Sequence, residues 1–151
     1  MLGYSFVDTD DVLIERLGCT IAESVQQSGW QKFRTLEREL LLELCSAENT
    51  VIATGGGAVL HTKAWEQLRE GAHVIWLQAE LATLLQRLQE DAKTAGQRPP
   101  LGTGNMETEI PDLLQEREKL YLKCSDTQCA TDRFTPQILA AILYAQLTTD
   151  F

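Results

Sequence analysis

The sequence predicts an α/β fold with a mostly parallel sheet flanked by helices. Short apolar runs alternate with longer segments of helical periodicity, and capping and turn residues separate the two kinds of segment. With 151 residues, 44% of them hydrophobic, the chain has the size and composition of one core. We therefore expect residues 1–151 to form a single domain.

The first strand and the first helix have clear boundaries. Residues 5–7 form a short apolar run that predicts a strand. The acidic cluster that starts at Asp8 predicts a helix N-terminus directly after this strand. Apolar spacing continues the helix over 12–17, and Gly18 ends it.

Two helical segments follow, separated at Gly29. Thr20, with Glu23 three residues later, has the pattern of a capping box, and residues 30–44 predict a longer helix. Its apolar side chains at three- and four-residue spacing are expected to face the core: Phe33, Leu36, Leu40 and Leu44. Its charged side chains are expected to lie elsewhere: Arg34, Glu37 and Arg38.

The rest of the chain keeps the same alternation. Buried strands are expected at 50–53 and 72–77, and a weaker one at 128–131. The expected helices are 62–69, 81–88, 107–122 and a last one that begins at Thr135-Pro136 and runs through Leu147.

Residues 91–105 break the periodicity. This stretch contains two prolines and three glycines among polar residues, which is typical of a mobile surface loop. One interpretation is a lid over an active site.

The overall charge limits the partners. The net charge is −9 and the sequence pI is near 4.7, which argues against general binding to nucleic acid or to anionic membranes. No apolar run approaches the ~20 residues that span a bilayer, and the start lacks a signal-peptide pattern. We expect a cytoplasmic protein.

The cysteines do not have metal-ligand spacing. Cys124 and Cys129 are five residues apart, and both histidines lie far away in sequence. Ordinary reduced thiols are therefore expected at all four positions: Cys19, Cys45, Cys124 and Cys129.

Three consecutive glycines, Gly55, Gly56 and Gly57, follow the strand at 50–53, and Asp8 and Asp10 follow the strand at 5–7. Ligands of open parallel sheets bind at the carboxyl ends of strands, so the two segments are expected to converge there. Glycine amides can bind an oxygen-rich ligand, and the two carboxylates can serve a hydrated magnesium ion and a hydroxyl. The alternatives are a plain flexible turn and helix capping.

Candidate cationic groups are arginines. Arg34 and Glu37 are one helical turn apart, so the carboxylate can hold the guanidinium for a bidentate grip on a substrate carboxylate. An ordinary surface pair is the alternative. Arg98 lies in the possible lid and Arg117 in the helix after it, where each could also be a plain surface residue.

Together these features resemble the shikimate kinase family over nearly the whole chain. The resemblance rests on residues 2–4, 6–10 and 18–22, Phe33-Arg34 with Glu37, residues 53–59, Arg98-Pro99, and Arg117 with Leu120-Tyr121. It implies a P-loop kinase architecture of the nucleoside-monophosphate-kinase type. It also implies ATP-dependent phosphorylation of the shikimate 3-hydroxyl, in chorismate and aromatic amino acid biosynthesis, with ATP and Mg²⁺ as cofactors. The family is expected to be monomeric.

The resemblance also implies residue roles. Asp10 and Arg98 would be catalytic, the latter as a lid cation on the phosphates, and Asp8 would order magnesium through water. The shikimate-binding set would be Asp10, Arg34, Arg117, Gly55, Gly56 and Gly57, with Glu37 orienting Arg34. The residues bordering the nucleotide would be Arg98, Arg87, Arg133 and Pro136.

One feature of the family has no counterpart in these 151 residues. Family members carry a G-x-x-x-x-G-K-[ST] phosphate loop, and this sequence contains no Gly-Lys dipeptide. The strand before that loop is central in the family's sheet, so we expect a sheet without its first, central strand, an inactive or weak chain, and possible self-association. Three explanations stay open: a shortened sequence of an ordinary kinase, a non-catalytic shikimate-binding or regulatory protein, or a kinase for another polyol such as gluconate.

Overall fold

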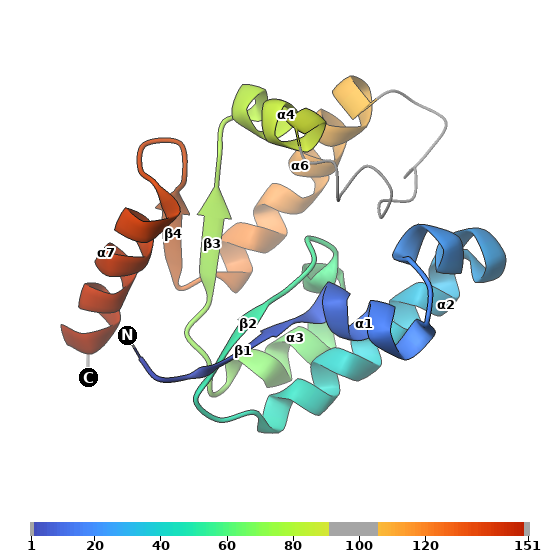
Figure 1. The fold of residues 1–151 in the computed structure, drawn as a ribbon, viewed down its shortest axis with the longest axis horizontal. Helices are drawn as coiled ribbons and strands as arrows, with labels where there is room; N and C mark the ends of the chain where they lie inside the picture. The colour runs from blue at the N-terminus through green and yellow to red at the C-terminus, as the bar shows by residue number, and fades with distance from the viewer. Residues whose placement is uncertain (1, 91–105, 150–151) are drawn as a thin grey trace.

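The computed structural model describes residues 2–90 and 106–149. The predicted lid at 91–105, with Arg98, lies outside the described residues. The described part is an α/β arrangement in which helices flank short parallel strands (Figure 1). The fold class expected from the sequence is confirmed at this level.

The described strands form two separate parallel pairs. Strand β1 (Ser5–Asp8) pairs with β2 (Thr50–Ala53), and strand β3 (Ile75–Gln78) pairs with β4 (Thr127–Ala130). Each pair is in register over four residues. The parallel direction agrees with the alternation of strands and helices along the chain.

The helices begin and end close to their expected positions. They are α1 (Thr9–Leu17), α2 (Ile21–Glu43), α3 (Thr62–Arg69), α4 (Leu81–Glu90), α6 (Met106–Cys124) and α7 (Pro136–Thr149), with short 3₁₀-helices η1 (Leu44–Ser46) and η2 (Ala58–Leu60). The predicted caps are present: Asp8 caps α1, Gly18 ends it with φ 65°, and Thr20 and Glu23 form the capping box of α2. Gly29, with φ 79° and ψ 161°, breaks α2 where the sequence predicts an interruption.

Two clusters of buried apolar side chains position the site. The first packs α1 against α2 through Leu13, Phe33 and Leu40, with Leu36 and Leu44 partly buried beside them, as the helical spacing predicts. The second joins α2, η2 and α3 around Leu41, Val59 and Trp65. Since α2 contributes residues to both clusters, packing on both fixes the position of its polar side chains between them.

The expectation that the strands at 50–53 and 72–77 are buried is wrong. Val51 in β2 and Leu77 in β3 are exposed, the latter with 61% of its surface accessible, and so is Phe6 in β1. Strand β3 also begins at Ile75 rather than at residue 72. The apolar runs do form strands, but no described element covers these faces.

A cleft of about 1900 Å³ separates the two strand pairs. We call it the inter-sheet cleft. All four residues of β2 and all four of β3 line it, together with exposed apolar side chains such as Phe6. Within the described residues, β2 pairs only with β1 and β3 only with β4. One edge of each strand therefore faces the cleft without a partner strand from the described chain.

Leu40→Ala is expected to lower the free energy of unfolding by about 2–5 kcal/mol, because it leaves a cavity where a 2% exposed side chain packs between α1 and α2. Urea denaturation measures the change. Leu42→Ala is the matched control on the same helix, since Leu42 is 41% exposed, and its cost should stay below about 1 kcal/mol. Equal losses for the two variants would contradict this placement of the core.

Candidate active site

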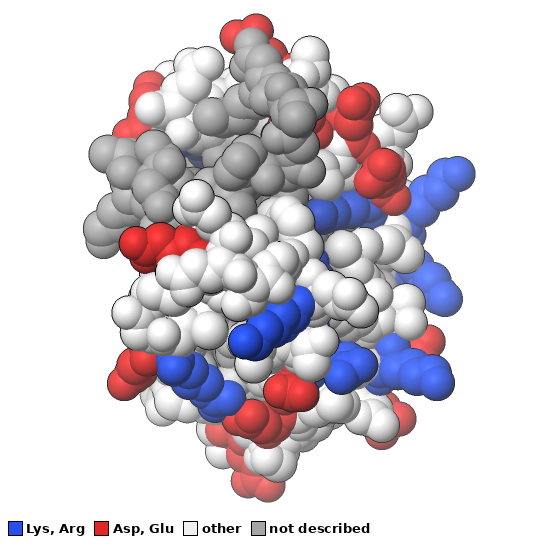
Figure 2. Space-filling view, turned by 90° about the vertical axis from the view of Figure 1, so that its right-hand side faces the viewer, with Lys and Arg blue, Asp and Glu red and all other residues white. Residues whose placement is uncertain are grey.

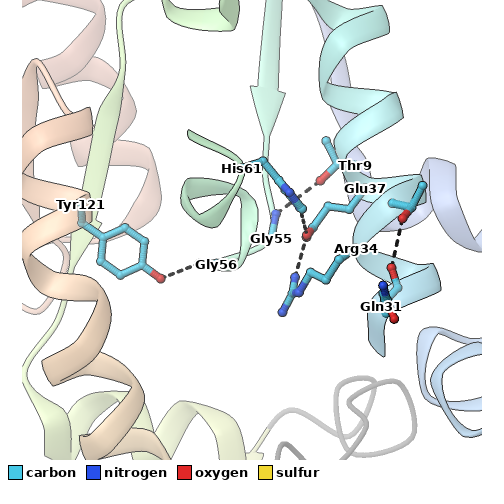
Figure 3. A network of polar contacts seen from close by, with 9 residues as sticks. Thr9, Gln31, Arg34, Glu37, Gly55, Gly56, His61 and Tyr121 are labelled. Carbon is cyan, nitrogen blue, oxygen red and sulfur yellow. Dashed lines mark hydrogen bonds and ion pairs between the residues drawn. The ribbon is translucent and has the colours of Figure 1, made fainter. Parts of the chain in front are cut away.

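The site lies where β1 and β2 end. Thr9, the first residue of α1, is buried, and its Oγ1 accepts a hydrogen bond of 3.3 Å from the backbone N–H of Gly55. This bond ties the start of the glycine run to the start of α1 (Figure 3). The predicted convergence of the two segments at the carboxyl ends of parallel strands is present.

The two aspartates have different environments. Asp8 Oδ1 accepts hydrogen bonds from the backbone N–H groups of Asp10, at 2.9 Å, and Asp11, at 3.3 Å, so Asp8 caps α1. The Asp10 carboxylate lies against Gly55: a Cβ at that glycine would be 3.0 Å from Asp10 Oδ1. Asp8 thus caps α1 through Oδ1, while Asp10 faces the glycine run.

Arg34 and Glu37 form a partly buried pair and not an ordinary surface pair. Arg34 Nη1 donates to Glu37 Oε2 at 2.6 Å, and the Glu37 side chain is only 5% exposed. His61 Nε2 lies 2.7 Å from the same oxygen. The expectation that Glu37 lies away from the core is wrong, because α2 is packed on two sides and Glu37 is buried between its neighbours.

The Arg34 guanidinium occupies the space that a side chain on Gly57 would fill. A Cβ there would be 2.7 Å from Cζ and 2.9 Å from Nη2 of Arg34, and closest of all to Nη1. The guanidinium also lies over the ring of Trp30, with Cζ 4.9 Å from the ring centroid. The ring of Trp30 therefore supports the Arg34 cation.

Helix α6 supplies the third side of the site. The Tyr121 hydroxyl donates to the backbone carbonyl of Gly56 at 2.7 Å, and the Tyr121 ring packs on Trp76 with centroids 5.4 Å apart. A Cβ at Gly56 would be 3.1 Å from the Tyr121 hydroxyl and 3.7 Å from Arg117 Nη1. Arg117 therefore reaches the same loop as Arg34, from another helix.

Each of the three glycines faces a different candidate side chain. Gly55 faces Asp10, Gly56 faces Arg117, and Gly57 faces Arg34. None of the three has a positive φ; at Gly57, φ is −84° and ψ is −12°. The glycines are therefore required for space and not for an unusual backbone conformation. We call this run the triglycine, and the close approaches at its Cβ positions favour a packing requirement over a plain flexible turn.

The residues expected to border the nucleotide lie at the other strand pair. Arg87 donates to Thr131 Oγ1 at 2.7 Å and to the Thr131 carbonyl at 3.0 Å, directly after β4. Arg133 lines the inter-sheet cleft, and Pro136 is the first residue of α7. These three therefore gather around residues 131–136, separate from the triglycine.

Three site residues are not among the candidates that the sequence indicates. Thr9 and Tyr121 belong to motifs that carry the family resemblance, so the sequence could have indicated them as site residues. No sequence pattern indicates His61, because its contact with Glu37 joins residues 24 positions apart and depends on the burial of both.

The four cysteines are free thiols, and burial raises the pKa of the Cys124 thiol, which favours its neutral form. Over residues 2–90 and 106–149, no group of three histidine, cysteine or acidic side chains could hold a metal ion. None of the helices in this part combines the length and apolar character needed to cross a bilayer.

Charges of both signs share one face of the molecule. On the face seen in Figure 2, lysine and arginine side chains are interspersed with acidic ones rather than forming a continuous basic surface. This distribution agrees with the net charge of −9.

Comparisons with known proteins agree on one family. Residues 1–147 match the family model described as shikimate kinase. A shikimate kinase of Synechococcus sp. (strain CC9902) is 38% identical over 142 residues, which are 94% of this chain and 72% of the relative. Shikimate kinase 2 of Yersinia pestis (strain Pestoides F) is 44% identical over 120 residues, 80% of this chain and 68% of the relative.

The solved structures give the same result. Shikimate kinase from Acinetobacter baumannii in complex with shikimate superposes with a TM-score of 0.84 at 32% identity, covering 97% of this chain and 80% of that one. Shikimate kinase from Aquifex aeolicus superposes with a TM-score of 0.76 at 27% identity, covering 99% and 85%.

Gly57→Ala is expected to displace the Arg34 guanidinium, because the new methyl group would overlap it while the backbone angles suit alanine. The free energy of unfolding should fall by about 1–3 kcal/mol as the buried Glu37 carboxylate loses a partner. A crystal structure of the variant and urea denaturation measure the two effects. Gly71→Ala is the control, since no atom lies within 4 Å of its Cβ position. An unmoved Arg34 would contradict the close approach.

Proposed function

The chain belongs to the shikimate kinase family, and we propose that its triglycine site binds shikimate and presents the 3-hydroxyl to ATP. One observation carries this proposal: Asp10, Arg117 and Arg34 each face one glycine of the triglycine. Two cations suit the carboxylate of shikimate, and one carboxylate suits a ring hydroxyl. The Acinetobacter baumannii shikimate kinase, whose structure is a complex with shikimate, supports the same ligand class.

The ligand is held between fixed groups. Two arginines bind the shikimate carboxylate. Arg34 is anchored by Glu37 and by the face of Trp30, and Arg117 reaches the site from α6. Asp10 accepts the hydrogen bond of the attacking hydroxyl and orients it, and the backbone of Gly56 borders the ring. Most of the rate gain in phosphoryl transfer comes from such positioning and from charge neutralisation.

ATP supplies the phosphoryl group, and magnesium offsets its negative charge. Asp8 offers a carboxylate at the end of β1, and it would order the ion through water. Arg87, Arg133 and Pro136 would border the adenine at the β4 side. Arg98, the proposed lid cation, lies outside the described residues.

The inter-sheet cleft accepts a β-strand that leads into a phosphate-binding loop. Two unpaired strand edges, one of β2 and one of β3, offer backbone hydrogen bonds on both sides of it within the described part of the chain. Exposed Phe6, Val51 and Leu77 supply an apolar lining. A strand in this place would join the two pairs into one parallel sheet and bring the loop amides beside the triglycine.

The two other functions considered for this sequence are not favoured. A non-catalytic binding protein and a kinase for another polyol such as gluconate would both use a pocket with hydroxyl-binding groups. The relatives and the solved structures that match the chain are named shikimate kinases, which favours the kinase of shikimate over both.

Arg34→Ala is expected to weaken shikimate binding by roughly 10- to 100-fold, because a bidentate charge-assisted contact is lost. Isothermal titration calorimetry with shikimate measures the affinity. Arg38→Ala is the matched control, an exposed arginine one turn further along α2, and should bind as the wild type does. Equal affinity of the Arg34 variant and the wild type would discredit the proposed site.

The 151-residue chain alone is expected to phosphorylate shikimate at less than about 1% of the rate of a version extended by an apolar strand and a G-x-x-x-x-G-K-[ST] loop. A coupled assay of ADP release measures both rates. An extension whose loop lysine is replaced by alanine is the control for the strand alone. Substantial turnover by the 151-residue chain itself would contradict the proposal that the cleft accepts a strand leading into the phosphate-binding loop.

A further inference from the structure

His61 contacts the group that holds Arg34. Its Nε2 lies 2.7 Å from Glu37 Oε2, the oxygen that also accepts from Arg34 Nη1 at 2.6 Å. Figure 3 shows the imidazole and the guanidinium converging on this carboxylate. An ionised carboxylate only accepts hydrogen bonds, so we assign the proton of this contact to Nε2.

The His61 backbone is anchored on both sides. Its N–H donates to the Ala58 carbonyl at 3.1 Å, and its carbonyl accepts from the Trp65 N–H at 2.8 Å. Ala58 and Trp65 are both buried, in the cluster that joins η2, α3 and α2. The imidazole, only 11% exposed, is therefore presented to Glu37 by a rigid segment that starts at the end of the triglycine.

The Glu37 carboxylate needs a second partner to stay in place. A buried carboxylate is costly unless several hydrogen bonds satisfy it, and a carboxylate with a single partner can rotate about its last torsion. Arg34 has a long side chain that is 23% exposed, so the orientation of its guanidinium depends on its hydrogen bond with the Glu37 carboxylate. A site residue that touches its ligand works best when a second residue restrains it.

We propose that His61 is a positioning residue: it fixes the Glu37 carboxylate, which in turn aims the Arg34 guanidinium at the carboxylate of the bound substrate. This inference rests on the proposed shikimate site. His61 does not touch the substrate, and its effect reaches the ligand only through Glu37 and Arg34. The segment after the triglycine thus does two tasks, since Gly57 leaves room for Arg34 and His61 restrains its partner.

The test is a set of shikimate titrations by calorimetry. His61→Ala is expected to weaken shikimate binding about tenfold. His61→Gln, whose amide nitrogen can donate in place of Nε2, should bind within about threefold of the wild type. His73→Ala is the matched control: His73 also makes a hydrogen bond through Nε2, 2.8 Å from Thr127 Oγ1, but at β4, and its loss should leave the affinity unchanged.

A double-mutant cycle separates positioning from general support of the fold. In an Arg34→Ala background, His61→Ala should cause no further loss of affinity, because its effect passes through Arg34. A further loss of about tenfold in that background, or a His61→Gln variant as weak as His61→Ala, would overturn the inference in favour of a purely structural role. Wild-type affinity in His61→Ala alongside a large loss in Arg34→Ala would overturn it while leaving the shikimate site intact. Wild-type affinity in Arg34→Ala would remove the shikimate site and this inference together.

Discussion

The site depends on the absence of side chains at three consecutive positions. A Cβ at Gly55, Gly56 or Gly57 would stand 3.1 Å or less from an Asp10, Tyr121 or Arg34 atom, and at Gly57 it would overlap the guanidinium. Groups from α1, α2 and α6 can therefore approach one short stretch of backbone. Because the backbone angles there are ordinary, steric room is the property that the sequence has to provide.

The second requirement is a buried negative charge. Glu37 sits in a helix that belongs to both apolar clusters, and it stays there because Arg34 and His61 share its Oε2. Removing one partner leaves a buried carboxylate poorly satisfied, which costs more than the bond itself contributes. Stability and the position of the Arg34 guanidinium are thus coupled at this residue.

Local chemistry made much of the fold predictable. The cap at Asp8, the glycine end of α1, the capping box at Thr20 and the break at Gly29 all follow from a few neighbouring residues. The Arg34–Glu37 pair follows from helical spacing. The burial of Glu37 and its contact with His61 do not, because they depend on how distant segments pack. The exposed strand faces have a similar explanation: an apolar run predicts a strand, while its burial depends on what covers it.

A crystal structure of the chain with shikimate tests the central claim most directly. The shikimate carboxylate should lie within hydrogen-bond distance of both Arg34 and Arg117, with a ring hydroxyl on Asp10. A carboxylate bound away from both arginines would contradict the account.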